Sequence, residues 1–289
     1  MKAILLLIFI LSVCNMFTLP GTKPGKHISH EKIFGKTAPG YNKYILKAVD
    51  KIQGQVMNGG GYYTNLNDKS KESPIGYELK IFNHSLITPP RQSSYCTGAT
   101  FAAFIEALNL IYPEGDTRLT LNRYEALRMQ EMNGSRREDF VKVWGNWNSQ
   151  WGAQYVIVKY VEMGKIVSHR AARPGDFINI LFKAGGGHSA IFLGWNKNDN
   201  GEIQLMYWSS QPETNGISDH VVSIGKIAKL AVVRLTDPGK IFSFDAAKKI
   251  FFQEGEFGRE VVKKAKSAQQ RSLYNKKLNY LYSHSNLKR

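Results

Sequence analysis

The amino-acid sequence predicts an α+β protein, in which a helix that begins at a cysteine packs on an antiparallel β-sheet that carries a histidine. Apolar residues recur at helical spacing over 41–56 and again after Cys96. Short apolar runs bounded by turn-forming residues predict strands in the second half of the chain. Of 289 residues, 43% are hydrophobic and 12% aromatic, which excludes disordered and fibrous classes. The predicted strands are 177–182, 189–194, 203–211 and 231–235.

The N-terminal segment has the pattern of a signal peptide, which we place at residues 1–20. Met1 and Lys2 precede an apolar run from Ala3 to Val13. This run is too short to span a bilayer as a helix. We therefore expect export, so that the protein is periplasmic or secreted, with a buried N-terminal strand or helix as the alternative.

Cys14 completes a second pattern in this segment. The residues Leu11-Ser12-Val13-Cys14 resemble the box at which bacterial lipoproteins are lipidated. Lipidation at Cys14 would attach the protein to a membrane, and a membrane partner is expected only in that case.

Residues 21–38 are polar, basic and rich in Gly and Pro, which predicts a linker or mobile arm. One globular domain is expected over 39–238. Its first helix covers 41–56 and ends at Asn58-Gly59-Gly60-Gly61, where glycines tolerate positive φ. A loop rich in turn formers is expected from there to Pro90.

The helix that follows Cys96 is predicted by apolar residues at positions i, i+3, i+4, i+7 and i+10, counted from Phe101. Ser93 or Ser94 is a suitable N-cap, which would place Cys96 in the first turn. The exposed amides and the helix dipole at that end stabilise a thiolate. A lone thiol beyond Cys14 in an exported protein favours a nucleophile, with a small buried core residue as the alternative.

A thiol nucleophile needs a general base, and one of the seven histidines is placed to supply it. His188 follows three glycines, 185–187, and opens the strand 189–194, so its side chain would face a cleft without steric cover. A structural histidine at a strand end is the alternative. The other histidines fall in the expected arm, in polar loops or element ends, or in the tail: His27, His30, His84, His169, His220 and His284.

The order of these motifs resembles the NlpC-type cell-wall cysteine peptidases of the papain-like superfamily, to which the CHAP amidases are related. In that family a cysteine at a helix start is followed two residues later by glycine, as Cys96 is by Gly98. A Pro-Gly-Asp turn and a strand follow, as at 174–182. A further strand opens with histidine, as at 188–194.

The resemblance covers residues 93 to about 236 and implies a papain-like (NlpC/CHAP-type) fold for the domain. The separation of Cys96 from His188 exceeds the usual spacing in the family, which implies an insertion at about 113–151. The tryptophans of this insertion would form the interior of a helical cap or shape a substrate cleft: Trp144, Trp147 and Trp151.

The resemblance also implies acyl transfer, in which a third residue accepts a hydrogen bond from the imidazole of His188 and orients it. A hairpin centred near Asn198 would place His188 opposite Trp208 or Ser209. Because an indole N–H can only donate, we expect Ser209 to be the third residue, with Gln211 as the alternate.

The oxyanion of that reaction would be held by the backbone N–H of Cys96 and by one side-chain donor, either Gln92 or Ser94. No cofactor is implied. The sequence has no His-x-x-x-His, no Glu-flanked histidine pair and no Cys-x-x-Cys, so no metal site is expected.

Residues 239–289 predict a basic helical extension, which either covers the domain as a solvated helix or binds an anionic polymer. The chain has 39 Lys and Arg against 23 Asp and Glu, a net charge of +16, so an anionic cell-envelope polymer is a candidate partner. No nucleic-acid-binding motif accompanies this charge, and nucleic acid is therefore not favoured.

Together, the residues and the resemblance imply an exported cysteine hydrolase that cleaves peptide or amide bonds in bacterial peptidoglycan through a thioester acyl-enzyme. Two alternatives stay open. One is a catalytically degraded papain-like binding protein of the cell envelope, and the other is an amidase for a substrate outside the wall. The hydrolase requires a Cys96 thiol of lowered pKa, whereas the degraded protein does not.

Overall fold

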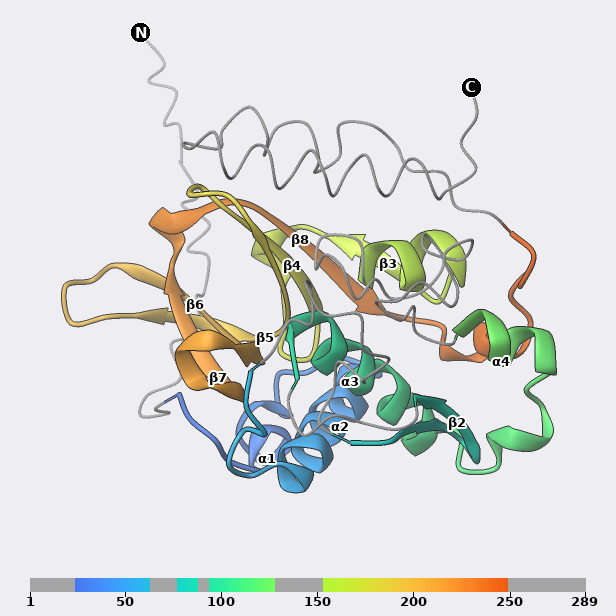
Figure 1. Cartoon of the computed structure of the whole chain (residues 1–289). Coiled ribbons are helices and arrows are strands. Elements are labelled where there is room, and N and C mark those ends of the chain that lie inside the picture. Colours follow the sequence, from blue (N-terminus) through green and yellow to red (C-terminus); the bar gives the residue numbers. More distant parts are fainter. Residues whose placement is uncertain (1–23, 63–76, 88–93, 128–152, 249–289) are drawn as a thin grey trace, which may run out of the picture.

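The computed structural model describes residues 24–62, 77–87, 94–127 and 153–248, and it has a mixed α+β architecture (Figure 1). Six antiparallel strands form the central sheet in the order β3-β8-β4-β5-β6-β7. A separate two-stranded hairpin consists of β1 and β2. The predicted combination of helices with an antiparallel sheet is confirmed.

The helices and strands have the following bounds along the chain. The helices are α1 (His30–Phe34), α2 (Asn42–Gln55), α3 (Cys96–Ile111), α4 (Leu121–Leu127) and a π-helix (Gln154–Tyr160). The strands are β1 (Leu79–Ile81), β2 (His84–Ile87), β3 (Gly164–Val167), β4 (Phe177–Phe182), β5 (Gly187–Lys197), β6 (Ile203–Gln211), β7 (Gly216–Ser223) and β8 (Ile227–Leu235). Short 3-10 turns lie at Gly115–Thr117, His169–Ala171, Pro212–Thr214, Ile224–Lys226 and Pro238–Phe242.

Helices α1, α2 and α3 lie on one side of the sheet (Figure 1). Helix α2 buries one apolar stripe, as its helical spacing predicts. Helix α3 is buried without interruption from Thr97 to Leu108, because it packs between α2, the β1–β2 hairpin and the sheet. A helix that is covered on all sides needs small residues where its neighbours approach, and α3 supplies Gly98, Ala99, Ala102 and Ala103.

The sheet has an apolar layer on each face, because successive side chains of a strand point in opposite directions. Ile191 of β5 and its cross-strand partner Trp208 belong to the layer shared with α2 and α3. The next pair, Phe192 and Tyr207, belongs to the layer on the opposite face. This alternation decides which residues near the start of β5 can face α3.

Asp176, from the Pro-Gly-Asp turn, is fully buried and ties three elements together. Its carboxylate accepts hydrogen bonds from Arg234 of β8, at 2.8 Å from Nε and 2.7 Å from Nη2. It also accepts from the Asn42 side chain at the start of α2, at 2.8 Å, and from the Arg173 amide at 2.7 Å. Asp176 therefore positions the start of β4 against both α2 and β8.

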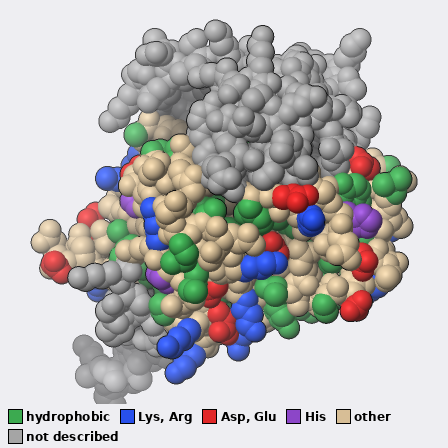
Figure 2. Space-filling model, turned by 60° about the horizontal axis from the view of Figure 1, so that its bottom comes forward, with side chains coloured by type: hydrophobic (Ala, Val, Ile, Leu, Met, Phe, Trp, Pro, Cys, Tyr) green, Lys and Arg blue, Asp and Glu red, His purple; other side chains and the backbone are tan. Residues whose placement is uncertain are grey.

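Charged side chains of both signs are mixed on the face turned forward in Figure 2, where Lys and Arg lie beside Asp and Glu. The lysine-rich run that suggested a polymer partner lies in 239–289, and of these residues the structure describes only 239–248. The signal-peptide region 1–20 and the Trp-rich part of the insertion, 128–152, lie outside the described residues as well. Within the described ranges, no helix has the length and hydrophobicity needed to cross a membrane.

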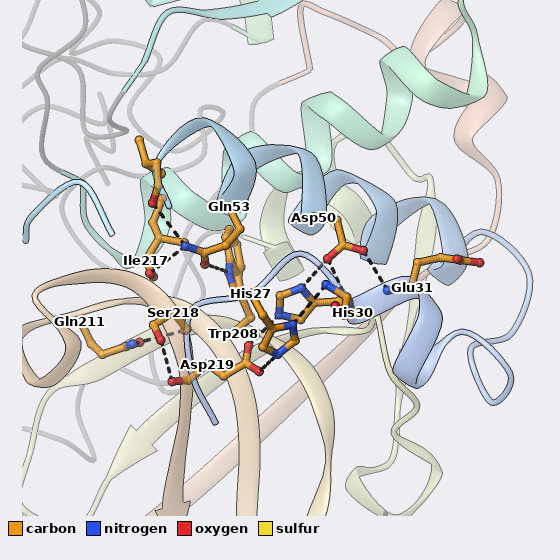
Figure 3. Close-up of polar contacts among 12 residues, drawn as sticks. His27, His30, Glu31, Asp50, Gln53, Trp208, Gln211, Ile217, Ser218 and Asp219 are labelled. Carbon is orange, nitrogen blue, oxygen red and sulfur yellow. Dashed lines mark hydrogen bonds and ion pairs between the residues drawn. The ribbon is translucent and has the colours of Figure 1, made fainter. Parts of the chain in front are cut away.

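Residues 21–38 were expected to form a polar linker, but their described part contains a helix. Residues 30–34 make helix α1, and His30 is fully buried between Asp50 of α2 and Asp219 of β7 (Figure 3). Burial lowers the pKa of His30, but the two carboxylates outweigh it and raise the pKa to about 9. The composition of the segment is that of a linker, and two distant aspartates fold it onto the core.

One further expectation was wrong, and one strand of the sheet was not foreseen. The loop expected before Pro90 contains the β1–β2 hairpin, in which Leu79 and Ile81 are buried. Strand β7 was not predicted, because its polar sequence 216–223 has no apolar alternation strong enough to suggest a strand. The β1–β2 hairpin packs against α3 and α4, and β7 pairs with β6.

Candidate active site

Cys96 is the first residue of α3 and is partly exposed. The predicted position in the first turn is therefore correct, whereas the predicted serine cap is not. The residue before the helix is Tyr95, with extended backbone angles (φ −143°, ψ 169°), and no side chain caps the helix. The Ser94 hydroxyl instead donates to Ser210 Oγ at 2.8 Å. The first turn of α3 therefore has no side-chain cap, and its amides and the helix dipole lie at the end that carries the thiol.

Hydrogen bonds place Cys96 near the end of the sheet where β5 starts and β6 finishes. Thr100, one turn further along α3, has its Oγ1 2.9 Å from Ser189 Oγ at the third residue of β5. On the other side, Ser94 contacts Ser210, the second-last residue of β6. The helix start therefore lies over the ends of these two strands and not over the middle of the sheet.

His188 is buried, with 8% of its surface exposed, and its Nε2 atom has no hydrogen-bond partner among the described residues. Burial lowers the pKa of His188 to about 4; Gln211 opposes this shift through a side-chain interaction, and His220 adds to it. The ring is consequently neutral at pH 7. A buried nitrogen without a partner costs about 1–3 kcal/mol, and such atoms often mark a site where a ligand or reacting group binds.

The His188 ring does not lie on the sheet face that carries α3. Its ring contacts Tyr207 edge to face, with centroids 5.3 Å apart, and alternation along β5 groups it with Phe192. The neighbouring residue, Ser189, faces α3 and contacts Thr100. Cys96 and His188 therefore approach the same end of the sheet from its two faces.

Electrostatic effects show that the thiol and the histidine share a neighbour. The pKa of Tyr207 is raised by burial, by Glu213 and by the nearby Cys96. Burial and then Cys96 likewise raise the pKa values of Tyr62 and Tyr95. Three phenol groups that stay protonated thus lie close enough to Cys96 to be influenced by its charge.

The two predicted third residues have different partners. Ser209 donates its hydroxyl hydrogen to the backbone carbonyl of Ser189, at 2.6 Å, and is not directed at the imidazole. Gln211 is the side chain whose interaction favours the protonated form of His188. Its Oε1 is buried and, like His188 Nε2, lacks a hydrogen bond of normal geometry with any described residue. The Gln211 side chain therefore lies near the His188 ring without forming a hydrogen bond of normal geometry to it.

The expected pairing of His188 with Trp208 or Ser209 was wrong. The β5–β6 register pairs Ile191 with Trp208, and extending it along the strands puts His188 opposite Gln211. Strand β5 runs to Lys197, so the turn lies further along the chain than a centre at Asn198 implies. Trp208 faces α2, where its Nε1 donates to Gln53 Oε1 at 3.0 Å.

Of the two expected oxyanion donors, neither is directed at the thiol by a described contact. The Ser94 hydroxyl hydrogen is already donated to Ser210, and Gln92 lies outside the described residues. The backbone N–H of Cys96, the other expected donor, lies at the start of α3.

Sequence reasoning missed Tyr62, Tyr207 and His220. Tyr62 comes beside the site through a parallel bridge to Ser94, and no local signal announces that contact. Tyr207 shares a strand face with Gln211, so period-2 alternation could have found it. His220 pairs across β6–β7 with Tyr207, in a strand that was not predicted.

The burial of neutral His188 predicts a specific loss of stability in acid. Its folded-state pKa of about 4 lies below the ordinary 6.5, so as pH falls the unfolded chain binds the proton first. Stability from this group is full above pH 6.5 and is lost as pH falls toward 4, by about 3 kcal/mol. Urea unfolding of the wild type and of His188→Gln at pH 7 and pH 4 should show this extra loss in the wild type alone. Equal losses in both proteins would contradict the buried neutral state.

Comparisons with models of protein families, with curated proteins and with solved structures find no match to this chain. The resemblance to papain-like cell-wall peptidases therefore depends on the residues quoted for it. What the site does must be argued from its own geometry and chemistry.

Proposed function

We propose that this protein is an exported cysteine hydrolase on a papain-like scaffold, which cleaves peptide or amide bonds in bacterial peptidoglycan. The reacting groups are the thiol of Cys96 and the imidazole of His188, and Gln211 orients the imidazole. No cofactor takes part in the steps proposed for these residues.

In the proposed reaction His188 Nε2 removes the thiol proton as Cys96 Sγ attacks the amide carbonyl carbon. The oxyanion accepts hydrogen bonds from the first-turn amides of α3. The C–N bond then breaks, and the amine leaves with the proton that His188 had taken. Water attacks the thioester with His188 again as the base, which releases the acid and restores the thiol.

The observation that carries this proposal is that the start of α3 at Cys96, which no side chain caps, and the buried Nε2 of His188, which has no hydrogen-bond partner among the described residues, lie at the same end of the sheet. A first-turn cysteine is favoured as a thiolate, and a neutral imidazole can accept a proton at neutral pH. Catalytic hydrogen bonds are often long in a substrate-free enzyme and tighten when substrate binds.

One observation favours a second candidate, a degraded papain-like protein that binds the cell envelope without cleaving it. Ser189, and not His188, faces the helix that carries Cys96. If Cys96 Sγ and His188 Nε2, which approach from opposite faces of the sheet, never come within hydrogen-bond distance, the thiol has no base. The two candidates differ in one property, which is whether the intact protein releases fragments from purified peptidoglycan.

The experiment that tests the proposal is digestion of purified peptidoglycan by the mature protein, with the released fragments identified by mass spectrometry. We expect fragments with new amine and carboxyl ends at one type of amide bond. Binding to the polymer without release would support the degraded protein. Neither binding nor release, together with cleavage of small acyl amides, would point to an amidase for a substrate outside the wall.

The choice between Ser209 and Gln211 gives a further prediction. Gln211→Ala should lower kcat/KM by about 10²-fold, because the imidazole loses the side chain that orients it. The matched variant Ser209→Ala removes a hydroxyl that serves a backbone carbonyl, so it should cost about 1 kcal/mol of stability and leave kcat/KM within about 3-fold. The reverse order of effects would reinstate Ser209 as the third residue.

A further inference from the structure

A second cluster of titratable side chains lies where the N-terminal arm crosses β7 (Figure 3). Asp219 has one carboxylate oxygen 2.8 Å from His27 Nε2 and the other 2.8 Å from His30 Nε2. These three ligand atoms, one from each residue, lie within 4.8 Å of one another. None of the three residues takes part in the proposed hydrolase reaction.

We propose that His27, His30 and Asp219 bind a divalent transition-metal ion, with Zn²⁺ as the ion they fit, and that the bound ion fastens the arm to the sheet. Two imidazoles and one carboxylate are a common ligand set for such ions, with water in the remaining position. The site is independent of the proposed function, and the activity of Cys96 is not needed for it.

The distances suit an ion of this size after a small expansion. Ligand atoms at about 2.0–2.1 Å from a tetrahedral zinc ion lie roughly 3.3 Å from one another. The distance of 2.8 Å between His30 Nε2 and Asp219 Oδ1 would therefore open by about half an ångström. His27 Nε2 lies 2.8 Å from the other oxygen, Oδ2, and would have to turn toward the same ion. His27 lies on the arm and keeps 25% of its side chain exposed, which gives the ion and a water ligand a route in.

The buried histidine already has the outer partner that metal-binding histidines have. His30 Nδ1 lies 2.6 Å from Asp50 Oδ1, and Asp50 also accepts the backbone N–H groups of His30 and Glu31. A carboxylate on Nδ1 holds the proton there and leaves the Nε2 lone pair for a cation. Because His30 Nε2 then faces a carboxylate of Asp219, either a proton or a metal ion must lie between them.

The charge of the cluster suits a divalent ion. The Asp219 side chain is 2% exposed and the Asp50 side chain 19%, so two carboxylates are held largely away from water. A divalent ion on Asp219 compensates both, and buried charges are found in proteins when they are paired or bound to metals.

Metal binding requires a local rearrangement of the partly exposed His27 side chain. The rings of His27 and His30 stack with centroids 4.2 Å apart and planes at 20°, so the His27 ring must turn for its Nε2 to face the same ion. His27 Nδ1 now accepts the amide of Ser29 at 3.2 Å. Coordination through Nε2 puts a proton on Nδ1, and this hydrogen bond is lost.

The test is metal binding by the full chain after it has been stripped with EDTA and dialysed. Titration with Zn²⁺ against a coloured chelator, followed by elemental analysis, should give one tightly held ion per chain. His27→Ala removes an exposed ligand and should lower the affinity by at least about 10-fold, while the matched variant of an exposed histidine, His169→Ala, should bind as the wild type does. Added Zn²⁺ should raise the Tm of the wild type by at least about 3 °C, and not that of His27→Ala.

Titration with Co²⁺ separates this site from the thiol. Nitrogen and oxygen ligands give visible bands without the near-ultraviolet charge-transfer band of a thiolate, and we expect the spectrum to be the same in Cys96→Ser. Retention of the ion by His27→Ala, or a spectrum that disappears in Cys96→Ser, would overturn the assignment. So would a wild-type chain that binds no stoichiometric Zn²⁺, since the cluster would then be a protonated histidine held by two carboxylates.

Discussion

Replacing Cys96 with alanine should abolish amide cleavage, with kcat/KM lowered by at least about 10³-fold. The variant lacks the sulfur atom that makes the proposed attack, and the backbone donors of α3 cannot form an acyl-enzyme by themselves. The measurement is the rate of fragment release from purified peptidoglycan by equal amounts of wild-type and variant protein. Thermal unfolding of both proteins checks that the helix start still folds, since Cys96 is only partly buried.

The control for this prediction is Cys96→Ser, which keeps a side chain of similar size but replaces the thiol by a much weaker acid. We expect it to be as inactive as Cys96→Ala. Fragment release by either variant at more than about one tenth of the wild-type rate would mean that another group performs the attack. In that case the helix start at Cys96 would be a structural feature.

The second large effect is expected at Asp176. Asp176→Ala should lower the free energy of unfolding by about 3–5 kcal/mol, because it leaves the Arg234 guanidinium largely buried without its bidentate partner. Asn42 at the start of α2 loses an acceptor in the same substitution. Urea unfolding at pH 7 measures the loss directly.

A matched control for Asp176 is Asp199→Asn in the exposed β5–β6 turn, which should change stability by less than about 0.5 kcal/mol. The double variant Asp176→Ala with Arg234→Met should recover part of the loss, because it removes both members of the buried pair. A loss below about 1 kcal/mol for Asp176→Ala would show that the turn does not depend on this network.

The elements that the sequence predicts correctly are those whose pattern is local. Helices α2 and α3 follow from apolar residues at helical spacing, and β4, β5 and β6 follow from apolar runs of strand length. Strand β7 and helix α1 could not be predicted in this way. Their sequences lack a clear apolar period, and their places are set by contacts with distant parts of the fold: β7 pairs along its length with β6, and His30 of α1 meets Asp219 across 189 residues of chain.

The candidate site shows the same division. The placement of Cys96 at a helix start is a local property, and it was predicted. Ser209 and Gln211 lie on the same face of β6, so the choice between them depends on which of the two the β5–β6 register brings opposite His188. The irregularity between Phe192 and Gly194 alters that register, and nothing in the local sequence specifies it.

The role of Asp176 could be noticed only as part of a motif. Pro174 and Gly175 announce a turn, but the carboxylate that follows is important because of Arg234 and Asn42, which lie 58 and 134 residues away. A single sequence does not indicate which of its charges will be buried together. The electrostatic neighbours of Cys96, Tyr62 among them, were hidden for the same reason.

The central claim is that Cys96 forms a covalent acyl-enzyme, and the most direct measurement is the intact mass of the protein after rapid acid quenching of a reaction with peptidoglycan fragments. We expect a fraction of the wild-type chain to carry the mass of an acyl group, mapped to Cys96 by peptide analysis and released by hydroxylamine. The adduct should be absent in Cys96→Ala and should form far more slowly in His188→Gln, which lacks the base that removes the thiol proton. Fragment release by the wild type with no adduct, and at an equal rate in Cys96→Ala, would contradict the account.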